Sequence, residues 1–239
     1  MSVQSEIDRI TGEVSNIRTA LNEKGISAST HKLADFDNDI RSIPSKPYKR
    51  RIKCVVTNGD HYYNTGLVPN SDWCASGVFK FNELGTNLGV FGTRSTTTAS
   101  STQSWYVYTN SANHLYMNKH GKTIEPNTAN ANKTIRNVSN VGRTIAVNDG
   151  TILQTGTATA ATGTCSSSYP LYLLSINTPS QNYPIFKGHL YRFTLFNHST
   201  GDVYADYIPV LDYNDKACLY DCVSGQLLYH VGSGDMAYY

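Results

Sequence analysis

From Arg51 onward the sequence alternates short runs of β-branched and aromatic residues with turns rich in Gly, Asn and Ser. Such runs are typical of β-strands, and Asn58-Gly59 is a dipeptide favoured in tight hairpin turns. The runs are RIKCVVT, GVFKF, LGVFGT, SWYVYT, HLYMNK, RTIAVND, YPLYLLSI, GHLYRFTLFN, VYADYIPVLD, ACLYD and QLLYHV. No helical periodicity interrupts the series. Many short strands at regular spacing predict an antiparallel β-sandwich or barrel, so we expect a mainly β domain.

The composition of the chain fits this pattern. Of 239 residues, 39% are hydrophobic and only 16% are charged, while 17 are tyrosines. A chain rich in Ser, Thr, Asn, Gly and Tyr suits strands that have one solvated face. The formal net charge of +2 gives no overall field that would attract nucleic acid or a membrane surface. No apolar run approaches membrane-spanning length, so we expect neither nucleic-acid binding nor membrane insertion.

The cysteines and the first residues indicate the compartment of synthesis. The five cysteines are widely spaced and form no C-x-x-C pair, which argues against a zinc site. They are Cys54, Cys74, Cys165, Cys218 and Cys222. We expect five reduced thiols, most of them buried. Residues 1–21 are amphipathic rather than apolar, so we expect no signal peptide and synthesis in a cytoplasm without Sec export.

A heptad pattern of apolar residues runs through the start of the chain. Ile7, Val14 and Leu21 occupy its a positions, and Val3, Ile10 and Ile17 its d positions. Lys24 and Gly25 form a helix stop signal, so a helix is predicted over residues 2–24. A helix of this length is marginal alone and gains stability by burying its apolar seam. β-branched residues at a and d favour a homotrimer, and the alternatives are docking on another protein or packing on the chain's own β domain.

The stretch SEIDRITGE raises the question of catalysis, because some jelly-roll glycoside hydrolases carry a Glu-x-Asp-x-x-Glu run. On a strand, Glu6 and Asp8 would point to one face. On a helix, residues two apart diverge by roughly 200°, so the two carboxylates cannot act on one substrate. The run also requires an acid at position 11, which is Thr11. We therefore assign this stretch to the helical seam.

A second helix is predicted over residues 30–42, before Pro44. The sequence LNEKGISASTHKLADFDNDIRSIP resembles a short helical module of bacteriophage tail and fibre proteins. We assign residues 1–44 to a helical anchor or oligomerisation segment, 45–50 to a linker and 51–239 to the β domain. The basic stretch SKPYKRRIK fits either a contact with nucleic acid or an acidic partner, or a solvated hinge, and the near-neutral chain favours the hinge.

Three blocks of the β domain resemble the concanavalin A-like, laminin-G-like jelly rolls of phage virion proteins and of proteins from gut bacteria. The blocks are HYYNTGLVPNSD, GHLYRFTLFNHSTGDVYADYIPVLD and ACLYDCVSGQLLYHVGSGDM. Their order and spacing match, so the resemblance implies an antiparallel jelly roll over residues 51–239. Two positions depart from the usual pattern. His230-Val231 stands in place of an Asn-Ala pair, and Asn64 stands in place of an aspartate, which weakens a potential cation ligand.

The β domain offers few groups for chemistry. Only two glutamates, Glu83 and Glu125, lie between residues 51 and 239, both in turn-like contexts, whereas glycosidases need two acids at a set separation. The aspartates form no pair on one strand face in an apolar setting. The sequence shows no nucleophile elbow and no metal-binding spacing of histidines. Residues 71–73 and 213–216 offer oxygen ligands but no dedicated calcium motif. We predict no enzymatic activity, no metal and no cofactor.

Carbohydrate binding is the functional option that the residues leave open. In a strand, Tyr106, Tyr108 and Asn110 would share one face. Tyr116 and Asn118 would share a face of the next run. If the two strands pair, these tyrosines and amides form one patch suited to stacking against a sugar. The alternative is that the tyrosines cover a solvated sheet face or pack between protomers.

These observations lead to two hypotheses from different classes. The first, which rests on the family resemblance, is a structural protein of a tailed-phage virion, a fibre or receptor-binding component. Its helices would trimerise and anchor to other virion proteins, and its jelly roll would project and contact host-surface glycans. Such a protein would be made in the host cytoplasm and released by lysis, which needs no export signal. The second is a stand-alone, non-catalytic bacterial lectin.

Overall fold

A computed structural model describes most of the β domain and the first helix. The described residues are 3–24, 46–70, 72–83, 87–95, 103–109, 114–119, 122–124, 135–141, 144–148, 153–157, 167–179 and 185–239. The chain divides into two compact units, Met1–Pro47 and Tyr48–Tyr239. The first contains helix α1 (Val3–Glu23), which agrees with the helix predicted from the heptad pattern. The second helix predicted over residues 30–42 lies outside the described residues.

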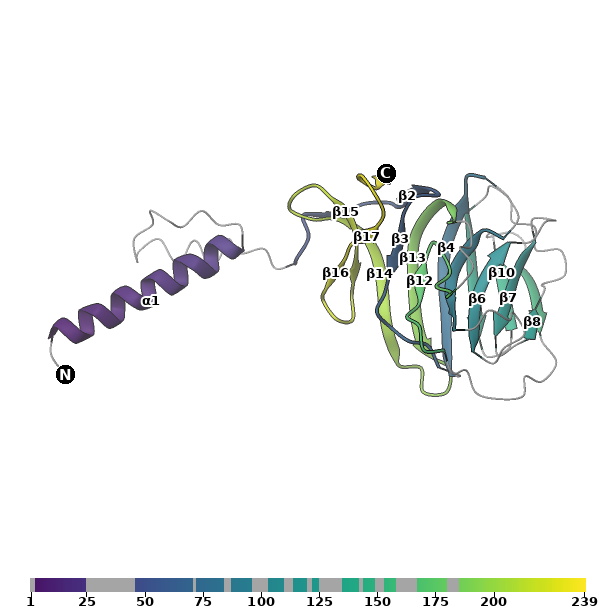
Figure 1. The fold of residues 1–239 in the computed structure, drawn as a ribbon, viewed down its shortest axis with the longest axis horizontal. Coiled ribbons are helices and arrows are strands. Elements are labelled where there is room, and N and C mark those ends of the chain that lie inside the picture. The colour runs from purple at the N-terminus through teal and green to yellow at the C-terminus, as the bar shows by residue number, and fades with distance from the viewer. Residues whose placement is uncertain are drawn as a thin grey trace. The chain divides into compact units, whose positions relative to one another are not determined.

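The larger of the two sheets is built around the long strand β13, which pairs with both β4 and β14 (Figure 1). Within the described residues it has 11 strands, with β11-β10-β9-β4-β13-β14-β15-β16 as its main path. Strand β1 joins it beside β14, and β2 pairs with β13 and β18. The bounds are β1 Arg50–Arg51, β2 Val55–Asn58, β4 Trp73–Phe81, β9 Ile135–Val141, β10 Thr144–Asn148, β11 Leu153–Thr157, β13 Lys187–Asn197, β14 Val203–Leu211, β15 Ala217–Asp221, β16 Leu227–Leu228 and β18 Ala237–Tyr238.

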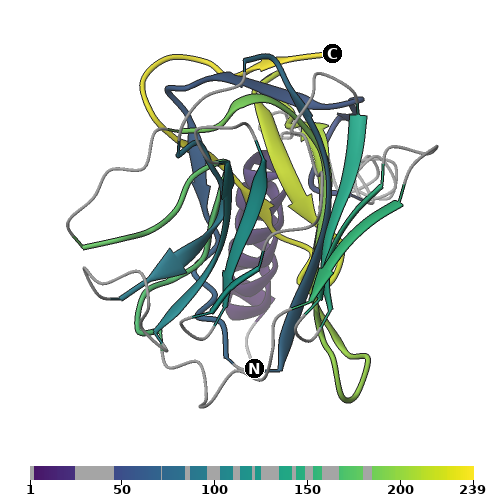
Figure 2. The same cartoon turned by 90° about the vertical axis from the view of Figure 1, so that its right-hand side faces the viewer.

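The smaller sheet faces the larger one as a second curved layer (Figure 2). Its described strands are, in spatial order, β17 (His230–Val231), β3 (Tyr62–Asn64), β12 (Tyr172–Leu173), β5 (Gly89–Arg94), β6 (Ser104–Thr109), β7 (Leu115–Lys119) and β8 (Lys122–Ile124). Neighbouring strands in this sheet are antiparallel. The prediction of a mainly β, antiparallel sandwich preceded by an N-terminal helix is confirmed.

An aromatic cluster holds the two layers together. Phe79 and Phe193 come from the larger sheet, and Phe91 and Trp105 come from the smaller one. The ring centroid of Phe193 lies 4.9 Å from that of Phe91, and the centroid of Phe91 lies 5.6 Å from that of Trp105. All four side chains are fully buried. Such tilted and edge-to-face contacts add to the hydrophobic stabilisation of the interface between the sheets.

Two runs that the sequence presents as single strands are divided in the structure. RIKCVVT is interrupted after Arg51, because β1 pairs with β14 whereas β2 pairs with β13 and β18. QLLYHV is divided at Tyr229, where the chain leaves the larger sheet, and β17 then pairs with β3 of the smaller sheet. The prediction of one strand in each run was wrong. In each case the two parts of the run pair with different strands, and for QLLYHV these strands belong to different sheets.

Candidate functional site

The outer face of β6 and β7 carries the predicted tyrosine patch. The register of the two strands places Tyr106 opposite Asn118 and Tyr108 opposite Tyr116. Trp105, Val107 and Met117 belong to the buried core between the sheets. Because side chains alternate along a strand, the intervening tyrosines and Asn118 lie on the face that points away from this core. The structure thus brings together four of the five residues, and Asn110 lies outside the described residues.

The tyrosine rings form a continuous row. The ring centroid of Tyr108 lies 5.4 Å from that of Tyr106 and 5.7 Å from that of Tyr116. The interplanar angles are 45° and 37°, which are tilted arrangements. Tyr108 and Tyr116 are half-buried, so parts of their rings remain accessible. Two neighbouring tyrosine rings offer an apolar surface with polar edges, which suits the C–H face and the hydroxyl groups of a sugar.

The other two predicted residues of the patch are buried. Tyr106 is 1% exposed and Asn118 is 2% exposed. The hydroxyl group of Ser104 donates a hydrogen bond of 2.6 Å to the side-chain oxygen of Asn118. The Asn118 amide therefore helps to join β6 and β7 beside the tyrosine row. The described part of the patch that a ligand can reach in this conformation consists of Tyr108 and Tyr116.

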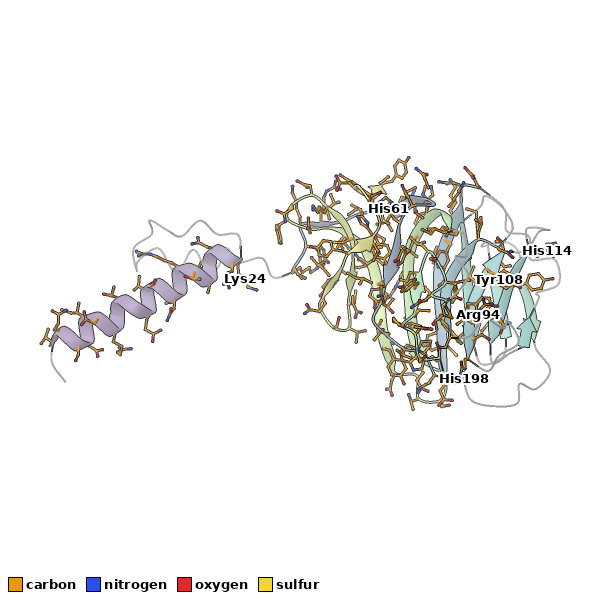
Figure 3. All side chains as sticks on the ribbon, in the orientation of Figure 1. Lys24, His61, Arg94, Tyr108, His114 and His198 are labelled. Carbon is orange, nitrogen blue, oxygen red and sulfur yellow. The ribbon has the colours of Figure 1, made fainter. Side chains whose placement is uncertain are left out.

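Arg94 is a member of this face that the sequence analysis missed. It lies opposite Ser104 at the end of β5, and its side chain is 1% exposed. Its guanidinium carbon lies 5.9 Å from the centroid of the Tyr106 ring, within the range of a cation–π interaction. Figure 3 shows Arg94 and Tyr108 in the part of the sandwich formed by β5–β8. One sequence signal could have indicated Arg94. Gly92 lies opposite Tyr106, and side chains two positions apart on a strand share a face, so Arg94 lies on the face of Tyr106.

The predicted oligomerisation seam lies along α1. Val3, Ile7, Ile10 and Ile17 are exposed, with values from 80% at Val3 to 36% at Ile17. Val14 is half-buried and Leu21 is buried. Exposed apolar residues in a heptad repeat are the surface that a coiled-coil partner would cover. No partner chain is present, so the homotrimer stays a prediction.

Asp202 and Asp206 of the β domain make structural contacts. The Asp206 carboxylate accepts hydrogen bonds of 2.8 and 2.7 Å from the Arg192 guanidinium, and these bonds lower the pKa of Asp206. Asp202 accepts a hydrogen bond from the hydroxyl group of Thr200 within its own turn. The two carboxylates thus have separate partners. Within the described residues, no group of three or more His, Cys, Asp or Glu is placed to hold a metal ion.

Asn64 and the described cysteines have positions that fit a structural role. Asn64, which stands where the resembling domains have an aspartate, accepts the backbone N–H of Gly66 at 3.1 Å. Of the described cysteines, Cys54, Cys74 and Cys218 are buried free thiols and Cys222 is an exposed one. Cys165 lies outside the described residues. None of the helices described has the length and apolar character needed to cross a membrane.

Comparisons with known proteins bear on the fold. No protein-family model matches the sequence, and no curated protein matches it either. Among solved structures, the chain is similar to a Bacteroides ovatus protein described as a "putative carbohydrate binding protein", with a TM-score of 0.54 and 10% identity. The match covers 79% of this chain and 60% of that one, so the chain spans less than two thirds of its length. This likeness shows the fold alone, an antiparallel β-sandwich of two sheets.

Two further solved structures are more distant. One is the Ruminococcus gnavus IT-sialidase CBM40 bound to α2,3-sialyllactose, with a TM-score of 0.44, 13% identity and coverage of 64% of this chain and 92% of that one. The other is the mouse laminin α1 chain, domains LG4-5, with a TM-score of 0.43, 12% identity and coverage of 65% and 44%. The bacteriophage origin stays a prediction from the sequence resemblance.

Proposed function

We propose that the sandwich is a non-catalytic carbohydrate-binding domain whose ligand lies on the outer face of β6 and β7. The observation that carries the proposal is the pair of partly exposed rings of Tyr108 and Tyr116, whose centroids are 5.7 Å apart. The Bacteroides ovatus protein with the same fold is described as a "putative carbohydrate binding protein", which supports a carbohydrate as the ligand. Glycan binding is common to the virion and lectin hypotheses, and this proposal assigns it to a defined surface.

The residues beside the two rings on the same sheet face explain how the rings would be held ready for a ligand. Tyr106 is buried against Tyr108, and the Arg94 guanidinium lies over the Tyr106 ring. The hydrogen bond between Ser104 and Asn118 joins β6 to β7 through their side chains. A sugar that stacks on Tyr108 and Tyr116 would meet rings already restrained by these contacts. Such preorganisation reduces the entropy that is lost on binding.

The proposal predicts that Tyr108→Ala lowers the affinity for the preferred glycan by roughly threefold to tenfold, because one stacking surface is removed. A glycan array first identifies that ligand for the intact chain, and isothermal titration calorimetry then compares the variants. Tyr213→Ala is the matched control, because Tyr213 is 50% exposed in the loop between β14 and β15. Equal losses in both variants would contradict the proposed surface. An array without any bound glycan would contradict the proposed function.

We propose separately that α1 forms a parallel trimer, which serves as the stalk of a virion fibre and holds the sandwich away from the particle. The support is the exposed apolar seam of α1 together with the resemblance of residues 21–44 to a phage helical module. In this proposal the protein reaches its location by assembly into the virion. The glycan-binding face would then be presented in three copies, and multivalency would raise the avidity of each particle for a glycan-coated surface.

The trimer has its own test. Light scattering of the intact chain is expected to give three times the mass of one chain, and Ile10→Asp is expected to give a single-chain mass, because a charge in the seam would be buried without a partner. Asn16→Asp, at an exposed position outside the seam, serves as the control and is expected to keep the trimer. An intact chain that remains monomeric across the concentration range would rule out self-association through α1.

A further inference from the structure

A second candidate site lies on the outer face of the larger sheet. In the register of this sheet, His189 on β13 lies opposite Val56 on β2 and opposite Lys80 on β4. The neighbouring residues Val55, Phe79 and Leu190 belong to the core between the sheets. By the alternation of side chains, the row formed by Val56, His189 and Lys80 points away from that core. This face is the opposite side of the sandwich from β6 and β7.

The row opens into a cavity of about 530 Å³. The lining residues come from four strands or their ends, namely β2, β4, β13 and β18. Polar groups in the lining include Lys53, Asn58, Lys80, Asn82, His189 and Tyr239. Residues from such different parts of the sequence meet here because β2 lies between β13 and β18 in the sheet. A volume of this size is within the range of small-ligand sites in proteins.

A stack of aromatic rings forms one wall of the cavity. The His189 ring lies nearly parallel to the Tyr191 ring, with a centroid separation of 6.0 Å and an angle of 12°. The His189 ring also lies nearly parallel to the Tyr239 ring, at 5.7 Å and 8°. The backbone N–H of Tyr239 donates to the carbonyl oxygen of Cys54 at 3.2 Å, which anchors the residue. Tyr239 is nevertheless 72% exposed, so its ring is available to a ligand.

The charge of the cavity is positive. Of the side chains in its described lining, two are ammonium groups, those of Lys53 and Lys80, and none is a carboxylate. Their effect extends to the imidazole: burial lowers the pKa of His189, and the charges of Lys80 and Lys53 lower it further. Two lysine ammonium groups in a lining that has no acidic side chain favour an anionic ligand.

The Cys54 thiol and the His189 imidazole are in contact in the cavity. The raised pKa and the burial of the thiol argue against a catalytic role. The Cys54 sulfur lies 3.3 Å from Nδ1 of His189. Burial raises the pKa of the Cys54 thiol, and the side chain is only 1% exposed. A nucleophilic cysteine needs a lowered pKa and access to its substrate. The contact of Cys54 with Nδ1 therefore helps to fix the orientation of the His189 ring.

We propose that this cavity binds an acidic saccharide. The ligand's carboxylate or sulfate group would lie between the ammonium groups of Lys53 and Lys80. Its ring would pack against the exposed ring of Tyr239, and its hydroxyl groups would meet the side-chain amides of Asn58 and Asn82. The combination of a fixed anion contact, a ring surface and neutral amides distinguishes this ligand class from a bare inorganic anion, which would use the lysines alone. The site is separate from the tyrosine row on β6 and β7 and does not depend on it.

The experiment uses the intact chain and three oligosaccharides of equal length: a uronic acid oligomer, a sulfated oligomer and a neutral one. Binding is followed by NMR through the side-chain amide signals of Asn58 and Asn82, and affinity is measured by calorimetry. We expect at least one acidic oligomer to bind at roughly millimolar concentration or below, and the neutral oligomer to bind more weakly. The acidic oligomer that binds more tightly shows whether the site prefers a carboxylate or a sulfate group.

Variants locate the binding. The double variant Lys53→Gln/Lys80→Gln is expected to lose about tenfold or more in affinity, because it loses charge-assisted hydrogen bonds. Lys49→Gln/Lys216→Gln removes the same charge elsewhere on the sandwich and is expected to bind normally. Tyr239→Ser is expected to weaken binding while the backbone anchor remains. Tyr108→Ala is expected to leave this binding unchanged, so failure of the β6–β7 site would not affect the result.

Three results would overturn the proposal. The first is an equal loss in the two lysine double variants, which would mean that only net charge attracts the ligand. The second is binding of the neutral oligomer as tight as that of the acidic ones. The third is the absence of any shift in the Asn58 and Asn82 signals with all three oligomers. An additional readout is the His189 ring itself, because an anion offsets the nearby lysine charges and is expected to raise the pKa of His189 in an NMR titration.

Discussion

Replacing Phe193 with Ala is expected to lower the free energy of unfolding of the sandwich by about 3–5 kcal/mol. Phe193 is fully buried on β13, the strand at the centre of the larger sheet. Its ring lies 4.9 Å from Phe91 of the smaller sheet and 6.4 Å from Phe79 of its own sheet, measured between centroids. The variant loses the transfer free energy of the ring and leaves a cavity between the two layers, which close packing cannot fill without distortion.

Urea denaturation, followed by tryptophan fluorescence, measures the effect of Phe193→Ala on the free energy of unfolding. A lower midpoint with an unchanged slope is the expected pattern, because the surface exposed on unfolding stays nearly the same. Val203→Ala is the control: Val203 is 45% exposed, and its variant should change the stability by less than about 0.5 kcal/mol. A loss of under 1 kcal/mol in Phe193→Ala would mean that the aromatic cluster does not hold the sheets together as described.

Replacing Asp221 with Ala is expected to lower the free energy of unfolding by about 2–4 kcal/mol. Asp221 ends β15, is only 6% exposed, and its carboxylate organises the turn that follows. One oxygen accepts the backbone N–H groups of Asp206 at 2.9 Å and Val223 at 3.1 Å. The other accepts the hydroxyl group of Ser224 at 2.6 Å. Alanine would remove the acceptor of these three part-buried hydrogen bonds, and their combined loss accounts for the expected effect.

The same denaturation experiment tests Asp221, with two comparisons. Asp221→Asn keeps one acceptor oxygen and is expected to lose about half as much stability as Asp221→Ala. Asp235→Ala removes an exposed carboxylate from the last turn of the chain and should have an effect below about 0.5 kcal/mol. If Asp221→Ala and Asp235→Ala destabilised the protein equally, the general loss of negative charge, rather than the hydrogen bonds, would explain the result.

Local pattern predicted much of the strand content. SWYVYT coincides with β6, and ACLYD coincides with β15. The heptad spacing from Val3 to Leu21 likewise falls within α1. These elements could be predicted because their signals are periodicities within a few residues, which depend on the backbone geometry of a single segment. The tyrosine face of β6 and β7 follows from the same rule once the two strands pair.

Burial and long-range pairing could not be predicted in this way. Tyr106 and Tyr108 share one strand face, yet the first is buried and the second is partly exposed. No local pattern separates them, because neighbours from other parts of the sequence differ along the strand, as with Arg94 of β5, which lies over the Tyr106 ring. The break of QLLYHV at Tyr229 has the same origin, since its two halves find partners in different sheets.

The sequence by itself determined the strand-rich domain, the helix before it and the alternation that puts tyrosines on one sheet face. These depend on local sterics and on the separation of apolar from polar side chains along one segment. The tertiary structure alone decided which tyrosines remain accessible and which residues meet in the lysine-lined cavity. Lys53, Lys80, His189 and Tyr239 come together there because the strand order of the larger sheet places β18, β2, β13 and β4 side by side. Such contacts arise from pairing between distant segments, whose free energy is gained only when the whole sheet forms.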